Sequence, residues 1–215
     1  MSIRHFILCA CALLVQVACT TDIRPIATRA EAGDPKAQFR YAQCFMYGEG
    51  TAQNPQQALH WFEKAALQGH RNAATAAGLC YATGIGSKQD YRKARRFLQY
   101  ASDWDHPRAQ LILAQLYAKG LGTAPNPEKA VENIRYSAMQ GHRKAALLMF
   151  FCFYEGFGVP KHETIAIGWL KNAAEFGSDE ANLLLKLYKN PKKRTFFEEK
   201  VKFYKNKLDF FPKKG

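Results

Sequence analysis

Residues 73–108 read AATAAGLCYATGIGSKQDYRKARRFLQYASDWDHPR, and this stretch is one copy of a unit that fills most of the chain. The same pattern of small and aromatic residues starts again every 36 residues. Three columns carry the period: the alanines 37, 73, 109 and 145, the aromatics 45, 81, 117 and 153, and the glycine pairs 48/50, 84/86, 120/122 and 156/158. A fixed period of this length is typical of stacked supersecondary units. The sequence therefore predicts a repeat array, a kind of architecture that usually binds macromolecules along an extended surface.

Each unit is predicted to be a helical hairpin. In the first copy the small and aromatic residues from Ala37 to Phe45 fall on one helix face. Gly48 is expected to end this helix, because glycine adopts the positive φ that helix ends require. Asn54 is then a suitable N-cap, and the proline after it is preorganised for a first helical turn. The equivalent caps in the later copies are Asp90, Asn126 and His162.

The in-phase residues resemble those of the Sel1-like repeat, a relative of the tetratricopeptide repeat. The second copy carries Ala73, Gly78, Tyr81, Gly84, Gly86, Asp90, Lys93, Ala94 and Ala101, and the fourth carries Gly156, Gly158, Trp169, Lys171, Ala173, Ala174 and Gly177. The resemblance implies an all-α fold, a right-handed α-solenoid of antiparallel helix pairs with a C-terminal capping helix. The array is expected over residues 34–189, with repeats at 37–72, 73–108, 109–144 and 145–180 and a partial fifth at 181–189.

The first 19 residues form a different kind of sequence, and residues 20–33 are expected to be a linker or the start of the array. An apolar run over residues 6–17 is short for a spanning helix and fits a secretory signal. It leads to Val17-Ala18-Cys19-Thr20, which resembles a bacterial lipoprotein signal, although Gln16 replaces the usual leucine. We predict lipidation at Cys19 and an outer-membrane lipoprotein. The alternatives are signal cleavage near Ala18, which gives a periplasmic or secreted protein, and an uncleaved anchor or a cytoplasmic protein.

Residues 190–215 form a basic C-terminal segment. They hold nine Lys or Arg and three Asp or Glu, which supplies +6 of the chain's net charge of +13. Apolar residues recur there at helical spacing, from Phe197 through Val201, Tyr204 and Leu208 to Phe211, and Thr195 with Glu198 suggests a capping box at the helix start. The helix is expected to cap the last repeat. The alternative is a basic amphipathic element that docks on an anionic membrane or an acidic partner.

Three cysteines of the array share one repeat position. These are Cys44, Cys80 and Cys152, and the third repeat has Leu116 there. A position that accepts Cys or Leu is typical of helix packing. Equivalent positions of stacked helices lie roughly 10 Å apart, which is too far for a disulfide. We therefore expect buried free thiols, and the spacing favours no metal site.

The resemblance implies that a partner binds in the concave groove that the first helices of the repeats line. The groove positions are Lys36, Phe39, Gln43, Tyr47, Asn72, Arg108, Gln115, Lys119, Lys144 and Phe151. One column of them, residues 36, 72, 108 and 144, is basic or amide in every repeat. Cations at helix starts oppose the helix dipole, so their recurrence favours an acidic partner. The alternative is a solvated charged edge without a binding role.

No catalytic motif emerges from the sequence. It has no phosphate-binding loop, no His-Glu-x-x-His and no Gly-x-Ser-x-Gly. We therefore expect a non-catalytic scaffold or adaptor of the bacterial envelope, or a secreted one with a role in host interaction, that uses no cofactor or metal. Binding to nucleic acid conflicts with an exported protein. The alternative function is a hydrolase or binding protein for β-lactams or peptidoglycan, as described for cysteine-rich Sel1-like proteins, although the cysteines of their disulfide ladder are missing here.

Overall fold

The computed structural model describes residues 22–212, and this part of the chain is helical without a β-strand. Four antiparallel hairpins follow one another, as the repeat predicted. They are α3 (Pro35–Tyr47) with α4 (Pro55–Leu67), α5 (Arg71–Thr83) with α6 (Tyr91–Asp103), α7 (Pro107–Lys119) with α8 (Pro127–Met139), and α9 (Arg143–Glu155) with α10 (Glu163–Glu175). Each of these helices has 13 residues. The all-α solenoid is confirmed.

Single helices close the two ends of the array. The first is α2 (Arg24–Glu31), and the last are α11 (Asp179–Tyr188), a 3-10 turn at Pro191–Lys193 and α12 (Arg194–Leu208). Helix α2 takes the place of a preceding second helix, and the Gln38 amide donates to the Ala30 carbonyl at 3.1 Å. Ala30 and Gly33 stand 36 residues before Ala66 and Gly69, so the repeat pattern already extends into this helix.

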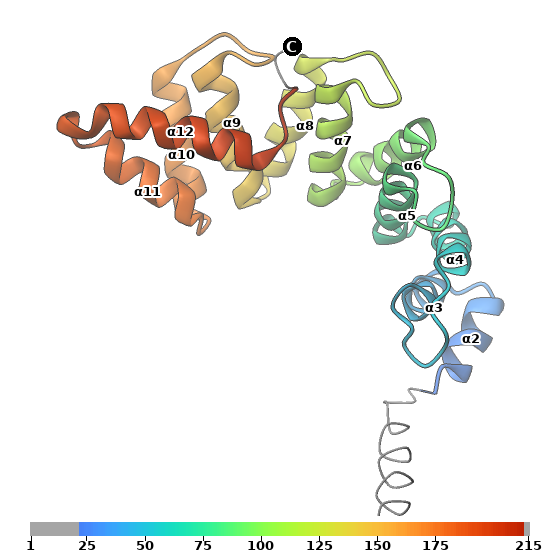
Figure 1. Ribbon diagram of the computed structural model, residues 1–215. Coiled ribbons are helices and arrows are strands. Elements are labelled where there is room, and N and C mark those ends of the chain that lie inside the picture. The colour runs from blue at the N-terminus through green and yellow to red at the C-terminus, as the bar shows by residue number, and fades with distance from the viewer. Residues whose placement is uncertain (1–21, 213–215) are drawn as a thin grey trace, which may run out of the picture.

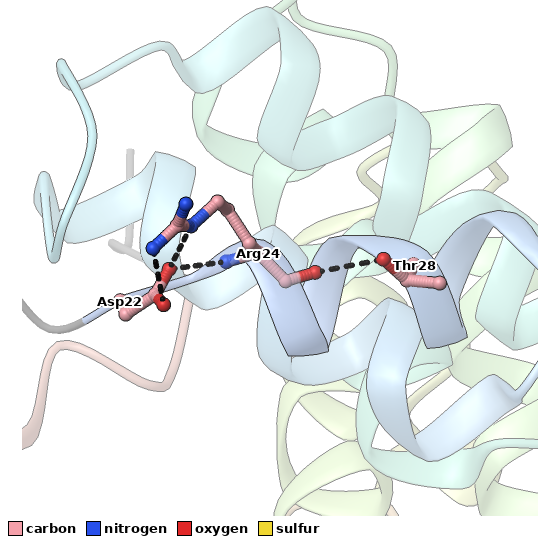
Figure 2. A network of polar contacts seen from close by, with 3 residues as sticks. All are labelled: Asp22, Arg24 and Thr28. Carbon is pink, nitrogen blue, oxygen red and sulfur yellow. Dashed lines mark hydrogen bonds and ion pairs between the residues drawn. The ribbon is translucent and has the colours of Figure 1, made fainter.

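A small polar cluster holds the start of α2. The Arg24 guanidinium donates to both carboxylate oxygens of Asp22, at 2.9 and 3.0 Å, and the Arg24 backbone N–H donates to Asp22 Oδ1 at 3.0 Å (Figure 2). The Thr28 hydroxyl donates to the Arg24 carbonyl one turn later. The Arg24 side chain lowers the pKa of the Asp22 carboxyl. Asp22 therefore stays charged and satisfies a backbone donor at the helix start.

The predicted caps start the second helices. Asn54 accepts from the Gln57 backbone N–H at 3.0 Å, and Asn126 accepts from the Lys129 N–H at 2.8 Å. Asp90 accepts from two backbone N–H groups, and His162 Nδ1 accepts from Ile165 N–H at 3.3 Å. Since each cap satisfies a donor that has no partner within the helix, the hairpin loops and helix starts occur where the sequence predicted them.

The second glycine of each loop joins one repeat to the previous one. Gly86 has a φ of 76°, and a Cβ atom built on it would lie 2.2 Å from the Pro55 carbonyl oxygen at the start of α4. A Cβ atom built on Gly122 or on Gly158 would lie similarly close to the backbone at the start of α6 or α8. A side chain at these positions would push neighbouring hairpins apart. The glycine period therefore reflects contact between repeats as well as loop conformation.

The hairpins follow a curved path from α2 to α11 (Figure 1). Helices α5 and α7, the first helices of successive repeats, also contact each other. Alanines with no exposed surface, such as Ala58, Ala94, Ala130 and Ala166, allow the helices to approach closely. Tyr81 donates to Glu63 of the previous repeat at 2.6 Å, and Tyr117 donates to Gln99 at 3.3 Å, so the recurring tyrosines also link the repeats.

Within residues 22–212, no helix is both long and apolar enough to cross a membrane.

Candidate partner-binding groove

All ten predicted groove positions lie on α3, α5, α7 and α9, the first helices of the repeats, and the surface of these helices has two halves. The half on α3 and α5, here called the open half, leaves Lys36 and Asn72 exposed and Tyr47 69% exposed. Gln43 is half-buried, and so is Phe39, whose ring stacks on His70 at a centroid distance of 4.6 Å. Arg108, at the start of α7, is exposed at the boundary of this half. The open half therefore presents polar and aromatic groups to solvent.

The other half, on α7 and α9, is covered by the chain's own C-terminal segment (Figure 1). Phe151 has no exposed surface, and its ring meets the Phe211 ring at 6.2 Å. Gln115 donates to the Asp209 carbonyl at 3.2 Å, and Lys119 Nζ lies 3.0 Å from Asp209 Oδ2. Three of the predicted groove residues thus contact the C-terminal segment of this protein. We call this surface the covered half.

Helix α12 is held by apolar contacts to the last repeat. Phe197 has no exposed surface, and its ring lies 6.0 Å from Tyr154 of α9 and 5.5 Å from Tyr188 of α11. On α12, Lys205 Nζ lies 3.1 Å from a carboxylate oxygen of Glu155. The helix therefore caps the end of the array, as expected, and also extends back across the groove.

Two details of this segment differ from the sequence analysis. The predicted capping box is wrong: α12 has no side-chain cap, and Glu198 instead pairs with Arg194 at 3.2 Å. The helix was also expected to extend to Phe211, but it ends at Leu208, because Asp209 adopts a left-handed φ of 42°. This break turns the chain, so that Phe211 reaches the groove from outside the helix.

Lys144 lies beside a polar hollow between α9, α11 and α12. The lining includes Lys144, Arg143, Glu180, Tyr204 and Lys207. The Lys144 side chain is exposed at the edge of the covered half, beside the basic side chains of Arg143 and Lys207. Lys144 is the last member of the column of basic and amide residues.

The starts of the first helices differ in the charge of their caps: Asp34 caps α3 with a carboxylate that accepts from the Lys36 backbone N–H at 2.9 Å, whereas histidines cap α5 and α7. Helices α3, α5, α7 and α9 have no acidic residue in their first turn. His70 Nδ1 accepts from Ala73 N–H and His106 Nδ1 accepts from Ala109 N–H, both at 3.2 Å. Burial lowers the pKa of both histidines, and neighbouring cations add to the effect. The two histidine caps are therefore mainly neutral at pH 7, whereas Arg29 lowers the pKa of the Asp34 carboxyl, so the cap of α3 is negative.

Asn72 has a structural partner in the next repeat. His106 Nε2 lies 3.0 Å from Asn72 Oδ1 while His106 Nδ1 accepts from the backbone, so the neutral ring donates through Nε2–H. Thr75 Oγ1 lies 3.3 Å from the same Nδ1. One member of the predicted column, Asn72, is thus held in place by a histidine of the next repeat.

The three cysteines of the array pack inside the first helices. Cys44, Cys80 and Cys152 are buried free thiols. Burial raises the pKa of all three, for Cys80 to about 11. They remain protonated at neutral pH and serve as small apolar groups, as predicted from the Leu116 equivalent. Among residues 22–212 no group of three His, Cys, Asp or Glu side chains could hold a metal ion.

The stacked hairpins and their inner groove define a helical-repeat solenoid of the tetratricopeptide type. The Sel1 repeat model matches residues 35–70, 72–103, 107–142 and 143–178, which is more than half of the chain. The protein belongs to the Sel1 repeat family. The Sel1 repeat fold is typically a non-catalytic scaffold that mediates protein–protein interaction. No curated protein matches the chain in sequence.

Two solved structures are similar to this protein over most of its length. One is c5321, a protective antigen of uropathogenic Escherichia coli strains with an SLR fold, at 28% identity and a TM-score of 0.75. The similar region covers 86% of this chain and 41% of the antigen's chain. The other is a Sel1 repeat protein from Oxalobacter formigenes, at 31% identity and a TM-score of 0.69. The similar region covers 78% of this chain and 49% of the Oxalobacter chain. This protein therefore spans less than half the length of either relative.

Proposed function

We propose that this protein is a non-catalytic scaffold or adaptor of the bacterial envelope that binds an acidic protein partner in the open half of its groove. The proposal rests on one observation: the C-terminal segment covers one half of the groove and leaves the other half exposed. The chain's own segment occupies the surface of α7 and α9, whereas Lys36, Tyr47 and Arg108 present exposed side chains. Exposed aromatic and basic groups on a concave surface suit a polypeptide ligand.

The charge of the open half supports an acidic partner. Lys36, Arg71 and Arg108 are exposed at its edge, and Arg71 donates one hydrogen bond to the Trp104 carbonyl at 3.3 Å. The helix starts beside Arg71 and Arg108 have no acidic cap, and the acidic cap of α3, Asp34 beside Lys36, is paired with Arg29. A partner with clustered carboxylates would meet a field of opposite sign, which raises the association rate and selects against basic partners.

The test compares two pairs of charge reversals. Lys36→Glu with Arg108→Glu changes the groove edge, whereas Arg92→Glu with Arg96→Glu makes the same charge change on the exposed face of α6. We expect photo-crosslinked partners from native envelope extracts to be lost with the first pair and kept with the second. Both pairs should unfold at the wild-type temperature, because all four side chains are exposed. Equal capture by both variants would remove the groove from the proposal.

The location in the envelope is part of the proposal and depends on Cys19, which lies outside the described residues. The lipoprotein-like sequence around Cys19 supports export. The similarity to a protective antigen supports contact with a host, since such an antigen must be accessible to it. Labelling with a palmitate analogue should mark the wild type and spare Cys19→Ala. A soluble, cleaved and unlabelled wild type would instead indicate a periplasmic or secreted adaptor.

A further inference from the structure

The segment Asp209–Phe210–Phe211, here called the latch, shows what the surface between α7 and α9 can hold. Phe210 and Phe211 are 3% and 9% exposed, and the Asp209 carboxylate faces Lys119. We infer that this surface is a binding site for peptides in which a carboxylate residue is followed directly by two aromatic residues, with the latch as its tethered competitor. The inference deepens the proposed function and rests on it, since it names a second ligand class for the same groove.

The polar part of the site recognises both a side chain and the backbone. Lys119 Nζ lies 3.0 Å from Asp209 Oδ2 and retains 23% side-chain exposure. The Gln115 amide donates to the Asp209 carbonyl at 3.2 Å. A carboxylate and a main-chain carbonyl of the same residue are thus read by two side chains one helical turn apart on α7. This pair fixes the register of whatever peptide lies there.

The apolar part of the site receives the Phe211 ring. The Phe211 ring lies 6.2 Å from Phe151 of α9 and 5.1 Å from Phe157 in the loop after α9, both in edge-to-face arrangement. Lys205 Nζ is 5.7 Å from the centroid of the Phe211 ring. Contacts of this kind favour an aromatic side chain over an aliphatic one of similar size.

The latch extends further than capping requires. The end of the array is already covered by α12, where Phe197 and Val201 are 0% and 3% exposed. Gln115 and Lys119 belong to the third repeat, which is not the end of the array, and both are polar groove positions. The latch therefore occupies a surface that has no exposed end to protect. A recognition surface explains its polar contacts better than a cap does.

The position of the latch also allows it to exchange with a free peptide. It follows the left-handed break at Asp209, so it can leave the groove while α12 stays anchored through Phe197. Its ion pair is largely exposed on the Asp209 side, at 67%, and exposed pairs contribute little to stability. Tethering gives the latch a high effective concentration, so a free peptide of equal contacts competes poorly until the latch is weakened.

The experiment uses the full chain and a fluorescent synthetic peptide, KNKLDFFP, which copies residues 205–212. We expect Phe210→Ala with Phe211→Ala to bind the peptide at least tenfold more tightly than the wild type, because the tethered competitor is lost. Asp209→Lys leaves both aromatic residues in place and should give a smaller increase. This second variant decides the outcome if the double alanine variant does not fold.

A charge exchange tests the register. In the unlatched background, Lys119→Glu should weaken binding of the native peptide and favour a peptide with Lys in place of Asp. Equal affinity of wild-type and unlatched protein for the native peptide, or indifference of both peptides to Lys119→Glu, would overturn the inference. The proposed function can survive that result, because capture at Lys36 and Arg108 is measured separately in the open half.

Discussion

The two halves of the groove are built from one repeat, yet one half is open and the other is covered. At the position of Phe151 the earlier repeats have Gln43, Leu79 and Gln115, and at the position of Tyr154 they have Met46, Ala82 and Ala118. The fourth repeat therefore places aromatic residues where the others place polar or smaller ones. These rings receive α12 and the latch. The repeat sets the positions of the helices, and the side chains that do not repeat decide which of them the C-terminal segment covers.

The largest expected effect comes from breaking the covered half. Phe197→Ala should lower the free energy of unfolding by about 3–5 kcal/mol, because it removes a fully buried ring from the contact between α12, α9 and α11. Phe203 lies on the same helix and is 55% exposed, so Phe203→Ala is the matched control with a change below about 0.5 kcal/mol. Urea denaturation measures both. Similar losses for the two variants would mean that α12 does not pack as described.

A second substitution breaks the open half at the junction of its two repeats. Gly86→Ala should cost about 3 kcal/mol, because it combines a positive φ with a Cβ atom 2.2 Å from the Pro55 carbonyl. Gly141→Ala is the control: it has a similar φ of 80° and no atom within 4 Å of the new Cβ. The control should lose about 1–2 kcal/mol from backbone strain alone. Equal losses in denaturation experiments would show that the loop does not contact the preceding repeat.

The sequence predicted the hairpins well because each boundary has a local chemical cause. Asn54, Asp90 and Asn126 cap helices through their own side chains, and glycines end helices by adopting a positive φ. Such signals act over a few residues, and the period repeats them four times. The same logic reached α12, whose Phe197 and Val201 are buried as the apolar spacing predicted.

The cover over the groove could not be predicted in the same way. Apolar spacing shows that one face of α12 is buried, and it does not show which surface buries it. The direction of the chain after α12 depends on the left-handed turn at Asp209. Aspartate tolerates this conformation, but its presence in a sequence does not predict it. The available signal was Phe151 at a groove position where the earlier repeats have Gln43, Leu79 and Gln115, since an aromatic residue stands there only in the fourth repeat.

The boundary between the two halves offers a smaller, stabilising test. Asp105, between α6 and α7, has a φ of 55° where the other repeats have glycine, such as Gly69 at 93° and Gly141 at 80°. Asp105→Gly should relieve strain and raise stability by up to about 1 kcal/mol, a rise in Tm of about 2–4 °C. Asp103→Gly, inside the last turn of α6, should have the opposite sign, since glycine weakens a helix. A lower Tm for Asp105→Gly would show that the aspartate side chain has a stabilising contact that outweighs its strain.

The smallest effect is a pH dependence of stability that arises from the histidines at the starts of the first helices. His70 and His106 cap α5 and α7 through Nδ1, whereas His142 makes no side-chain cap bond to α9. Burial holds the pKa of His70 and His106 below the ordinary value, with Lys36, Arg71 and Arg108 lowering it further and Asp34 opposing at His70. The unfolded chain therefore binds more protons as pH falls through about 6.5, so this stability is present above that pH and is lost below it.

Replacing both capping histidines by asparagine keeps an acceptor at each helix start without a titrating ring. The Tm of the wild type should fall more steeply between pH 7 and pH 5 than the Tm of His70→Asn with His106→Asn. His142→Asn should behave differently, because a new acceptor for the start of α9 replaces a ring whose buried Nδ1 has no partner. We expect that variant to be more stable than the wild type at pH 7 as well. If the Tm of the wild type and of the double variant falls equally between pH 7 and pH 5, groups other than these two histidines control the loss of stability in acid.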